Sequence, residues 1–326
     1  MLFTTGSIEK ERSRVLNAMN GSNYYKDGKS VLEQLFWRTQ YSEFCIKTDP
    51  LMSNKTYSKL IKHQNAVNTD SLYLENEVKI EKYWVNYALK TLHKPKTSPI
   101  LAKIRGKSCI VVGAGSCLRN KKLGKKIDSF EVVIRLNEAP LKGYEKLVGS
   151  RTDVRILYPE SAPTEREFYL GFGVVVVVPF KTDDFIWTAK QINRKLNESL
   201  KFWRKSADKI KVRPDKIFIM NPEISEFVFK KAAKPTWQSR GTTGFFAIQL
   251  ALNLCGKVTI AGFCYQTDLT PSQQKKKKFA SSLKYLYYYG RDKTDNVQEK
   301  SHTHTHSAEP KMRQKLFKSG LVDILE

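Results

Sequence analysis

The sequence has no apolar run long enough to cross a membrane. A membrane-spanning helix needs roughly 18 or more consecutive apolar residues, and no stretch of the 326 residues reaches that length. The opening residues, MLFTTGSIEKERSRVL, contain no apolar run of signal-peptide length. The sequence as written therefore predicts neither a membrane anchor nor a secretion signal.

Acidic residues are scarce relative to basic ones, and metal-ligand spacings are missing. The chain has 57 Lys and Arg against 32 Asp and Glu, a formal net charge of +25. This charge favours anionic partners, but no zinc-finger, RNA-recognition or helix-turn-helix pattern accompanies it. The five cysteines are odd in number and not spaced as metal ligands. We expect no metal site and no nucleic-acid partner, and the charge alone keeps a nucleic-acid binder open as an alternative.

Three short apolar runs stand out in residues 108–163. They cover residues 109–112, 132–136 and 154–158, and small or polar residues follow each of them. Such runs are typical of parallel strands in an α/β sheet, whose ligands bind outside the carboxyl ends of the strands. We therefore predict an α/β fold with its site at these strand ends.

The rest of the chain continues this pattern. Further strands are predicted at residues 174–178, 217–220 and 258–261, and helices at 183–200, 245–254 and 309–318. Thr242 or Thr243 is a suitable N-cap, and Gly256 falls where a helix end favours a left-handed residue. Residues 72–92 have helical spacing. We expect a flexible lead at residues 1–30, a helical segment at 31–106 packed on the outside, and the α/β domain at 107–326.

A glycine turn follows the first predicted strand. Val111-Val112-Gly113-Ala114-Gly115 resembles the start of a dinucleotide fingerprint, but the third glycine is replaced by Leu118. A dehydrogenase is therefore a weak hypothesis. A glycine turn before a helix still offers N–H groups to a phosphate.

Four stretches in order identify a family by resemblance. The first holds Cys109 to Gly113, Ile127-Asp128-Ser129, residues 132–137 and Tyr158-Pro159-Glu160-Ser161, and the second holds Thr243-Gly244, Ala251-Leu252, Cys255 and Ala261-Gly262-Phe263. The third is Tyr287-Tyr288-Tyr289, and the fourth is His304 with Glu309. Together they resemble the large, small, third and very small sialyl motifs of animal sialyltransferases. The Tyr-Pro-Glu-Ser ending is typical of the α2,3 branch, which attaches sialic acid to galactose.

The resemblance implies a fold, an activity and a donor site. The fold is a three-layer α/β/α sandwich with a mainly parallel Rossmann-like sheet, the sialyltransferase variant of the A-type glycosyltransferase fold. The activity is transfer of N-acetylneuraminate from CMP-sialic acid to a terminal galactose, with inversion and without a metal or cofactor. The sequence fits the metal-free part, because Asp183 and Asp184 are adjacent and form no Asp-x-Asp triplet. The implied donor-binding residues are Gly113, Gly115, Ser116, Asn137, Asn221, Thr242, Thr243, Gly244, Gly262, Phe263, Tyr287 and Tyr288, and the implied acceptor-side residues are Tyr158 and Glu160. Two simpler roles stay open, since Asn137 can merely end a strand and Thr243 can merely cap a helix.

His304 is the predicted general base. Inverting transfer needs a group that takes the proton of the acceptor hydroxyl, and histidine suits neutral pH. The resemblance pairs His304 with Glu309 and favours it over His302 and His306. The alternative is that this His-Thr-His-Thr-His tract is exposed and binds metal adventitiously.

The chain departs from the family pattern at Ala114, Cys117, Cys264 and Tyr287. The family carries histidine at the position of Tyr287, where it would stabilise the leaving phosphate. A tyrosine hydroxyl donates a hydrogen bond there but carries no charge. A catalytically weakened relative that binds nucleotide or glycan without turnover is therefore the alternative function.

The resemblance also implies a disulfide and a location. Cys109 and Cys255 are the implied pair, and a second pair between Cys117 and Cys264 follows if their two strands are parallel neighbours; the alternative is two buried free cysteines. Sequons stand at Asn20, Asn54 and Asn197. Family members work in the Golgi lumen as type II membrane proteins, on glycoprotein or glycolipid acceptors, and the sequence as written does not contain their anchor.

Overall fold

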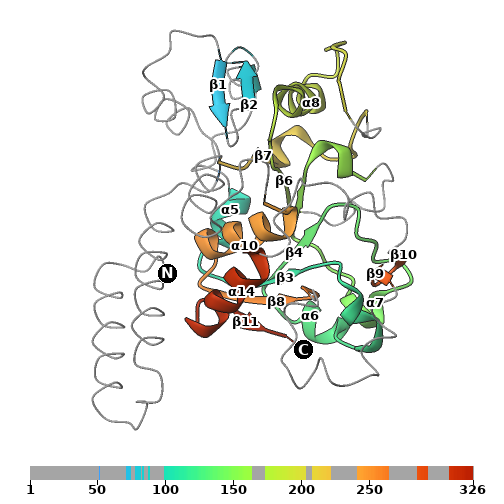
Figure 1. Ribbon diagram of the computed structural model, residues 1–326. Coiled ribbons are helices and arrows are strands. Elements are labelled where there is room, and N and C mark those ends of the chain that lie inside the picture. Colours follow the sequence, from blue (N-terminus) through green and yellow to red (C-terminus); the bar gives the residue numbers. More distant parts are fainter. Residues whose placement is uncertain are drawn as a thin grey trace, which may run out of the picture.

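The structure is a computed structural model (Figure 1), and it describes residues 51, 71–74, 78–81, 83, 87–88, 99–163, 173–202, 208–221, 241–263, 285–292 and 308–325. Residues 1–50, 222–240, 264–284 and 293–307 lie outside these ranges, among them the predicted flexible lead at residues 1–30. Among the described residues no helix is long and apolar enough to cross a membrane.

The described residues form one central seven-stranded sheet. Its strand order is β11-β8-β3-β4-β5-β6-β7, and every pairing in it is parallel. The strands are β3 (Ser108–Val112), β4 (Val132–Leu136), β5 (Val154–Leu157), β6 (Val174–Val177), β7 (Ile217–Ile219), β8 (Lys257–Ala261) and β11 (Asp323–Ile324). The predicted strands are confirmed. Their apolar runs are buried on both faces of the sheet, as is typical of parallel sheets.

Helices cover both faces of this sheet, which makes three layers (Figure 1). α5 (Pro99–Ile104), α10 (Thr243–Leu254) and α14 (Ala308–Lys318) contribute to the core on one face. α6 (Gly124–Asp128), α7 (Glu145–Val148) and α8 (Thr182–Ile192) contribute to the cores on the other. Short 3-10 turns η3 (Ser116–Asn120), η4 (Pro159–Ser161) and η6 (Pro214–Lys216) follow β3, follow β5 and precede β7. The expected α/β/α sandwich is confirmed.

A disulfide ties the amino end of β3 to the end of α10. Cys109 and Cys255 are bonded with their Cα atoms 6.0 Å apart, across 146 residues of chain. A cross-link over so long a loop restricts the unfolded chain strongly. The implied pairing is confirmed, and it lies at the end of the sheet opposite the predicted site.

Three predictions about local structure were wrong. β1 (Ser71–Leu74) and β2 (Val78–Glu81) are antiparallel strands and not part of a helix, because the alternating pattern of LYL and VKI outweighs the helical spacing. α8 ends at Ile192, where a helix to residue 200 was expected. Gly256 is not left-handed; its lack of a side chain lets Gly106 O approach, which a Cβ would meet at 2.5 Å.

The N-terminal part of the chain contacts the α/β domain. Leu51 forms an antiparallel bridge with Met220, beyond the end of β7. The Asn193 Nδ2 atom, just after α8, donates a hydrogen bond to the Tyr87 hydroxyl at 2.7 Å. Both contacts lie on the β7 and α8 side of the sheet.

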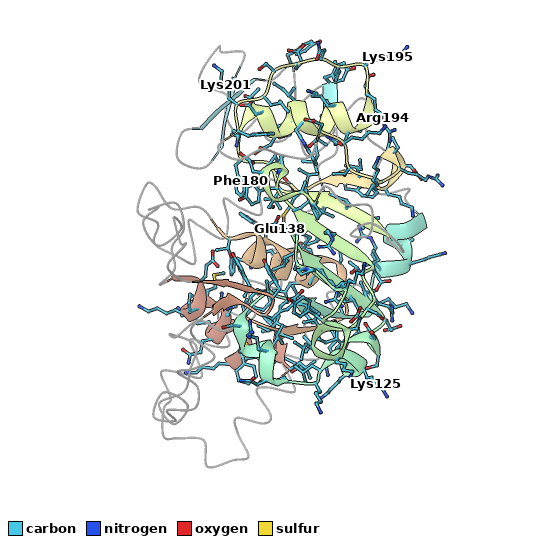
Figure 2. All side chains as sticks on the ribbon, turned by 90° about the vertical axis from the view of Figure 1, so that its right-hand side faces the viewer. Lys125, Glu138, Phe180, Arg194, Lys195 and Lys201 are labelled. Atoms are coloured by element: carbon cyan, nitrogen blue, oxygen red, sulfur yellow. A yellow bond between two sulfur atoms is a disulfide. The ribbon has the colours of Figure 1, made fainter. Side chains whose placement is uncertain are left out.

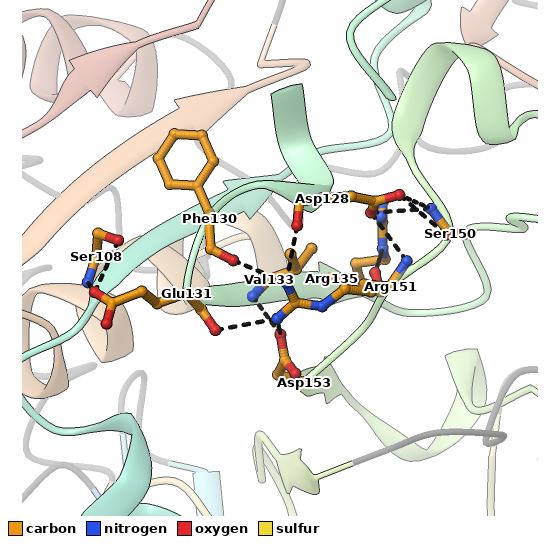
Figure 3. Close-up of polar contacts among 9 residues, drawn as sticks. All are labelled: Ser108, Asp128, Phe130, Glu131, Val133, Arg135, Ser150, Arg151 and Asp153. Atoms are coloured by element: carbon orange, nitrogen blue, oxygen red, sulfur yellow. Dashed lines mark hydrogen bonds and ion pairs between the residues drawn. The ribbon is translucent and has the colours of Figure 1, made fainter. Parts of the chain in front are cut away.

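The amino ends of β3, β4 and β5 are joined by a polar network (Figure 3). Asp128 accepts hydrogen bonds from the backbone N–H groups of Ser150 and Arg151, and Arg151 Nη2 forms an ion pair with Asp153 at 2.9 Å. Gly149, at φ 78°, leaves the space that the Asp128 carboxylate occupies. Asp128 belongs to the large motif, yet this network stabilises the amino ends of the strands, at the end of the sheet opposite the predicted site.

Candidate functional site

The order in which the chain adds strands to the sheet reverses between β3 and β8. From β3 it adds β4, β5, β6 and β7 on one side, and it then returns to place β8 and β11 on the other. In open α/β sheets the crevice at such a switch point, outside the carboxyl ends, is where ligands bind. The residues that leave β3 and β8 here are Gly113 to Ser116 and Gly262-Phe263.

Glycines let these two loops touch. A Cβ on Gly113 would lie 2.5 Å from the Gly262 carbonyl oxygen, and one on Gly262 would lie 2.6 Å from Leu118. The N–H groups of Gly113 and Gly115 donate to the carbonyls of Ala261 and Gly262, at 2.7 and 2.9 Å. Both N–H groups are therefore engaged within the protein. The glycine turn serves close packing of the two loops, and these two amides are not offered to a phosphate as expected.

Asn137, at the carboxyl end of β4, has a strained backbone. Its φ is 44°, and it is the one non-glycine residue with positive φ among the described residues. This conformation is costly for most residues and tolerated by Asn. Arg155 Nη1 donates to the Asn137 carbonyl, and Ser161 Oγ donates to its side-chain Oδ1 at 2.6 Å. The Asn137 amide is thus held in one orientation, which its simpler role as a strand end does not explain.

The N-terminus of α10 meets the same strand ends. Thr242 is the N-cap, and its Oγ1 accepts a hydrogen bond from Phe245 N at 3.2 Å, so Thr242 and not Thr243 is the cap. A Cβ on Gly244 would lie 2.9 Å from the Phe263 ring and 3.5 Å from Leu136. Gly244 therefore brings the first turn of α10 against the ends of β8 and β4. First-turn N–H groups have no acceptor within their own helix.

Glu309 is bound to the cap of α10. Its carboxylate accepts hydrogen bonds from Thr242 N at 2.6 Å and from Thr242 Oγ1 at 2.7 Å, and Arg313 Nη1 lies 3.8 Å from Glu309 Oε2. Glu309 and Arg313 are both buried. Glu309 is predicted to act with His304 in catalysis, and His304 lies outside the described residues. The Glu309 carboxylate joins the start of α14 to the start of α10.

A tyrosine hairpin covers the glycine turn. It consists of β9 (Tyr285–Tyr287) and β10 (Gly290–Asp292), and Tyr287 forms a bridge with Gly115 while Tyr288 N donates to Ala114 O at 2.9 Å. Tyr288 is buried, its hydroxyl donates to Pro140 O, and burial raises its pKa. The rings of Tyr287 and Tyr289 are stacked, with centroids 5.1 Å apart. Of the two predicted donor-binding tyrosines, Tyr287 is the half-exposed one.

The ends of β5 and β6 carry the predicted acceptor side. Tyr158 packs edge-to-face on Phe180, with ring centroids 6.3 Å apart, and both rings are half-buried. Glu160 is fully buried and pairs with Lys181 Nζ. Lys181 Nζ also lies 3.7 Å from Asp184 Oδ1. Glu160 therefore stabilises this side of the site, and its buried side chain is not exposed to a ligand.

The buried Asp184 gives the fold a pH dependence. Burial raises the pKa of Asp184 to about 7, against the opposing effects of Lys181 and two backbone N–H groups. An unfolded Asp titrates near about 3.9. The folded state binds this proton more tightly, so stability falls as pH rises from about 4 to about 7, and the full cost remains above pH 7.

Substituting Asp184 by Asn tests this. The wild type is expected to lose about 2 to 3 kcal/mol of unfolding free energy from this group between pH 5 and pH 8. Urea unfolding of Asp184→Asn at the two pH values should show that loss removed. Asp183→Asn, one residue away on the same helix, is the control and should keep the wild-type difference. Equal pH differences in the wild type and Asp184→Asn would contradict the assignment.

Several predicted site residues lie elsewhere or outside the described ranges. Asn221 is fully buried beyond β7, four strand positions and thus roughly 19 Å from β3. Cys117 is disulfide-bonded, and its predicted partner Cys264 lies outside the described residues, as do His304, Asn20 and Asn54. Asn197 is exposed in the loop after α8.

Sequence reasoning missed the residues that orient others. Arg155 and Ser161 hold Asn137, Arg313 lies beside Glu309, and Lys181 joins two buried carboxylates. The signal for Arg155 was a charged residue within a strand whose neighbours are apolar on both faces. Arg135, its in-register neighbour on β4, gives the same signal; its guanidinium donates to Arg151 O and Val148 O, and burial lowers its pKa to about 10.

The fold and the site together define an α/β protein with a candidate ligand site at a switch point, between the carboxyl ends of β8, β3 and β4 and the N-terminus of α10. Within this class, the chain belongs to glycosyltransferase family 29, the sialyltransferases, whose family description matches residues 54–321. The expected family is confirmed.

Individual relatives agree with the α2,3 branch. The human CMP-N-acetylneuraminate-beta-1,4-galactoside alpha-2,3-sialyltransferase is 35% identical over 70% of this chain, and the match spans 59% of that relative's length. The rat type 2 lactosamine alpha-2,3-sialyltransferase is 31% identical over 93% of this chain and 86% of its own. A crystal structure of a mammalian sialyltransferase in complex with Gal-beta-1-3GalNAc-ortho-nitrophenol has a TM-score of 0.60 at 20% identity, covering 88% of this chain and 94% of that one.

Proposed function

We propose that this chain transfers N-acetylneuraminate from CMP-sialic acid to the 3-hydroxyl of a terminal galactose. The observation that carries the proposal is the meeting of the Gly113 loop, Asn137, the Thr242–Gly244 turn and Phe263 at one switch point in a chain of the sialyltransferase family. The names of its relatives, which act on beta-1,4-galactosides, type 2 lactosamine and lactosylceramide, support galactose as the acceptor sugar.

The donor fits the described groups without a metal. CMP-sialic acid carries a phosphate and a carboxylate, and helix N-termini bind anions through their first N–H groups and the helix dipole. We assign this role to the N–H groups of Thr243 and Gly244 at the start of α10. Since Asn137 Oδ1 accepts from Ser161, its Nδ2 is the group that donates to the nucleotide.

His304 takes the proton in the proposed step. The galactose 3-oxygen attacks C2 of the sialic acid, the bond from C2 to the phosphate oxygen breaks, and CMP leaves with that electron pair. The imidazole of His304 accepts the proton of the attacking hydroxyl, and C2 is inverted. Glu309 acts as a positioning residue five positions further on, because it fixes the start of α14 to the Thr242 cap.

Tyr287 supports a second candidate function. It takes the histidine position of the third motif and lies beside Gly115, with its ring stacked on Tyr289. A phenol donates a hydrogen bond to a leaving phosphate but adds no positive charge. Binding of nucleotide or glycan without turnover is therefore the alternative.

We also propose that the chain works in the Golgi lumen. Its family is consistent with that location, and the described disulfide suits an oxidising compartment. The exposed sequon at Asn197 would then carry an N-glycan.

Product analysis tests the activity. The wild type is incubated with CMP-sialic acid and either a type 2 disaccharide or lactosylceramide, and the product is analysed by mass spectrometry before and after an α2,3-specific sialidase. His304→Ala should lower kcat by about 10²- to 10⁴-fold, whereas His302→Ala, in the same tract, is the matched control. CMP binding by calorimetry separates the alternatives: binding without product favours the non-catalytic function, and neither binding nor product overturns both.

A further inference from the structure

Lys181 is held between two buried carboxylates. Glu160 accepts a hydrogen bond from its ammonium group, and Asp184 Oδ1 lies 3.7 Å from the same nitrogen. Both carboxylate side chains are 0% exposed, while that of Lys181 is 28% exposed. The ammonium also lies over the Phe202 ring, 4.7 Å from its centroid. Three side chains from three segments therefore fix one lysine.

This arrangement is costly to the fold. Burying a carboxylate is unfavourable unless it is paired and hydrogen-bonded. Here one ammonium serves two carboxylates, and Glu160 Oε2 and Asp184 Oδ1 have no hydrogen-bond partner among the described residues. Asp184 Oδ2 accepts from the N–H groups of Phe180 and Lys181, so the cluster also fixes the backbone between β6 and α8.

The cluster is adjacent in sequence to two half-buried rings, those of Tyr158 and Phe180. Tyr158 is two residues before Glu160 and Phe180 is one residue before Lys181, and the two rings pack edge-to-face. Phe180 also packs on Phe246 of α10, with centroids 5.7 Å apart. Ser161, next to Glu160, bonds Asn137. In the view of Figure 2, Phe180 lies between the α8 end of the molecule and Lys125 on α6.

We propose that Lys181 is a positioning residue for the acceptor: by joining Glu160 and Asp184 it holds the Tyr158–Phe180 ring pair in place to receive the apolar face of the acceptor sugar. The inference rests on the proposed function and adds the subsite. Sugar rings present C–H groups on one face, and sites for such ligands combine aromatic surfaces with few fixed polar groups. An ammonium that bridges the segments after β5 and β6 sets the distance between the two rings.

Separate KM values for donor and acceptor test the inference. Lys181→Met removes the charge and keeps most of the volume, and it should raise the acceptor KM about tenfold while the donor KM stays within about twofold. Phe180→Leu should do the same. Because Lys181 acts through the rings, the double variant should be no worse than the more affected single variant. Lys190→Met, on the same helix as Asp184 and hydrogen-bonded to Glu198 O, is the matched control.

A second variant and a binding measurement test the role of Lys181 if Lys181→Met does not fold or the wild type gives no product. Glu160→Gln keeps the volume and weakens the bond to Lys181, so it should shift the acceptor KM in the same direction if Lys181→Met does not fold. Acceptor dissociation constants, measured in the presence of CMP, decide the matter if the wild type gives no product. Equal rises in donor and acceptor KM, or effects of Lys181→Met and Phe180→Leu that multiply, would overturn the inference while leaving the activity itself intact.

Discussion

Glu309→Ala is expected to lose both stability and transfer activity. The substitution removes the acceptor of Thr242 N and of Thr242 Oγ1, so the α10 cap and the start of α14 are no longer joined. It also removes the carboxylate beside the buried Arg313 guanidinium. Breaking a buried charged contact from one side costs about 3 to 5 kcal/mol. Urea unfolding should show a loss of that order.

Activity distinguishes Glu309 from an ordinary stabilising residue. At temperatures where Glu309→Ala remains folded, kcat/KM should still fall by at least about 100-fold, because the misplaced segment carries His304. Glu145→Ala, an exposed first-turn glutamate on α7, should cost less than about 1 kcal/mol and leave activity unchanged. A folded Glu309→Ala variant with normal kcat/KM would show that the cap contact does not position the base.

Gly113→Ala is expected to weaken donor binding strongly. The new Cβ would lie 2.5 Å from the Gly262 carbonyl oxygen and 3.0 Å from the carbonyl carbon. Both are backbone atoms held by the Gly113–Ala261 and Gly115–Gly262 hydrogen bonds, so no flexible side chain can relieve the contact. The ends of β3 and β8 must move apart at the switch point. Overpacking of this kind costs about 1 to 3 kcal/mol.

The effect on CMP binding should exceed the effect on stability. Calorimetry should show at least about a 30-fold weaker CMP affinity, since a displacement of about 1 Å at a binding site is enough for such losses. Gly143→Ala is the control, because that glycine has φ 83° but no atom within 4 Å of the new Cβ. It should cost about 1 kcal/mol through backbone strain alone and leave CMP affinity unchanged. Normal CMP binding by Gly113→Ala would mean that the donor does not bind between these loops.

The sequence predicted the sheet because its strands are buried on both faces. Runs such as the five valines from Val174 to Val178 have no other stable place in an α/β protein. The pairing of β1 with β2 was missed because their short runs fit helical spacing as well as alternation. Gly256 was misassigned since a helix-ending glycine can serve either a left-handed turn or close packing, and only the contact with Gly106 decides.

The site was predicted in position and less well in role. The resemblance located Asn137, Thr242 and Phe263, which the fold brings to one edge. It could not separate Asn137 from Asp128, which belongs to the same motif but lies at the amino ends of the strands. Contacts between distant segments decide such roles, as with Glu309 and Thr242, which are 67 residues apart. The Glu160–Lys181–Asp184 cluster was missed for the same reason.

Calorimetric titration of CMP into the wild type and Asn137→Asp tests the proposed donor site most directly. Asn137→Asp keeps an oxygen for Ser161 but replaces the donating Nδ2 with a charged oxygen facing the phosphate. Asn253→Asp is the control at the other end of α10, roughly 15 Å from Thr243. We expect Asn137→Asp to weaken CMP binding at least about 30-fold, whereas Asn253→Asp should bind CMP as the wild type does. Equal affinities in all three proteins would contradict a donor site at this strand edge.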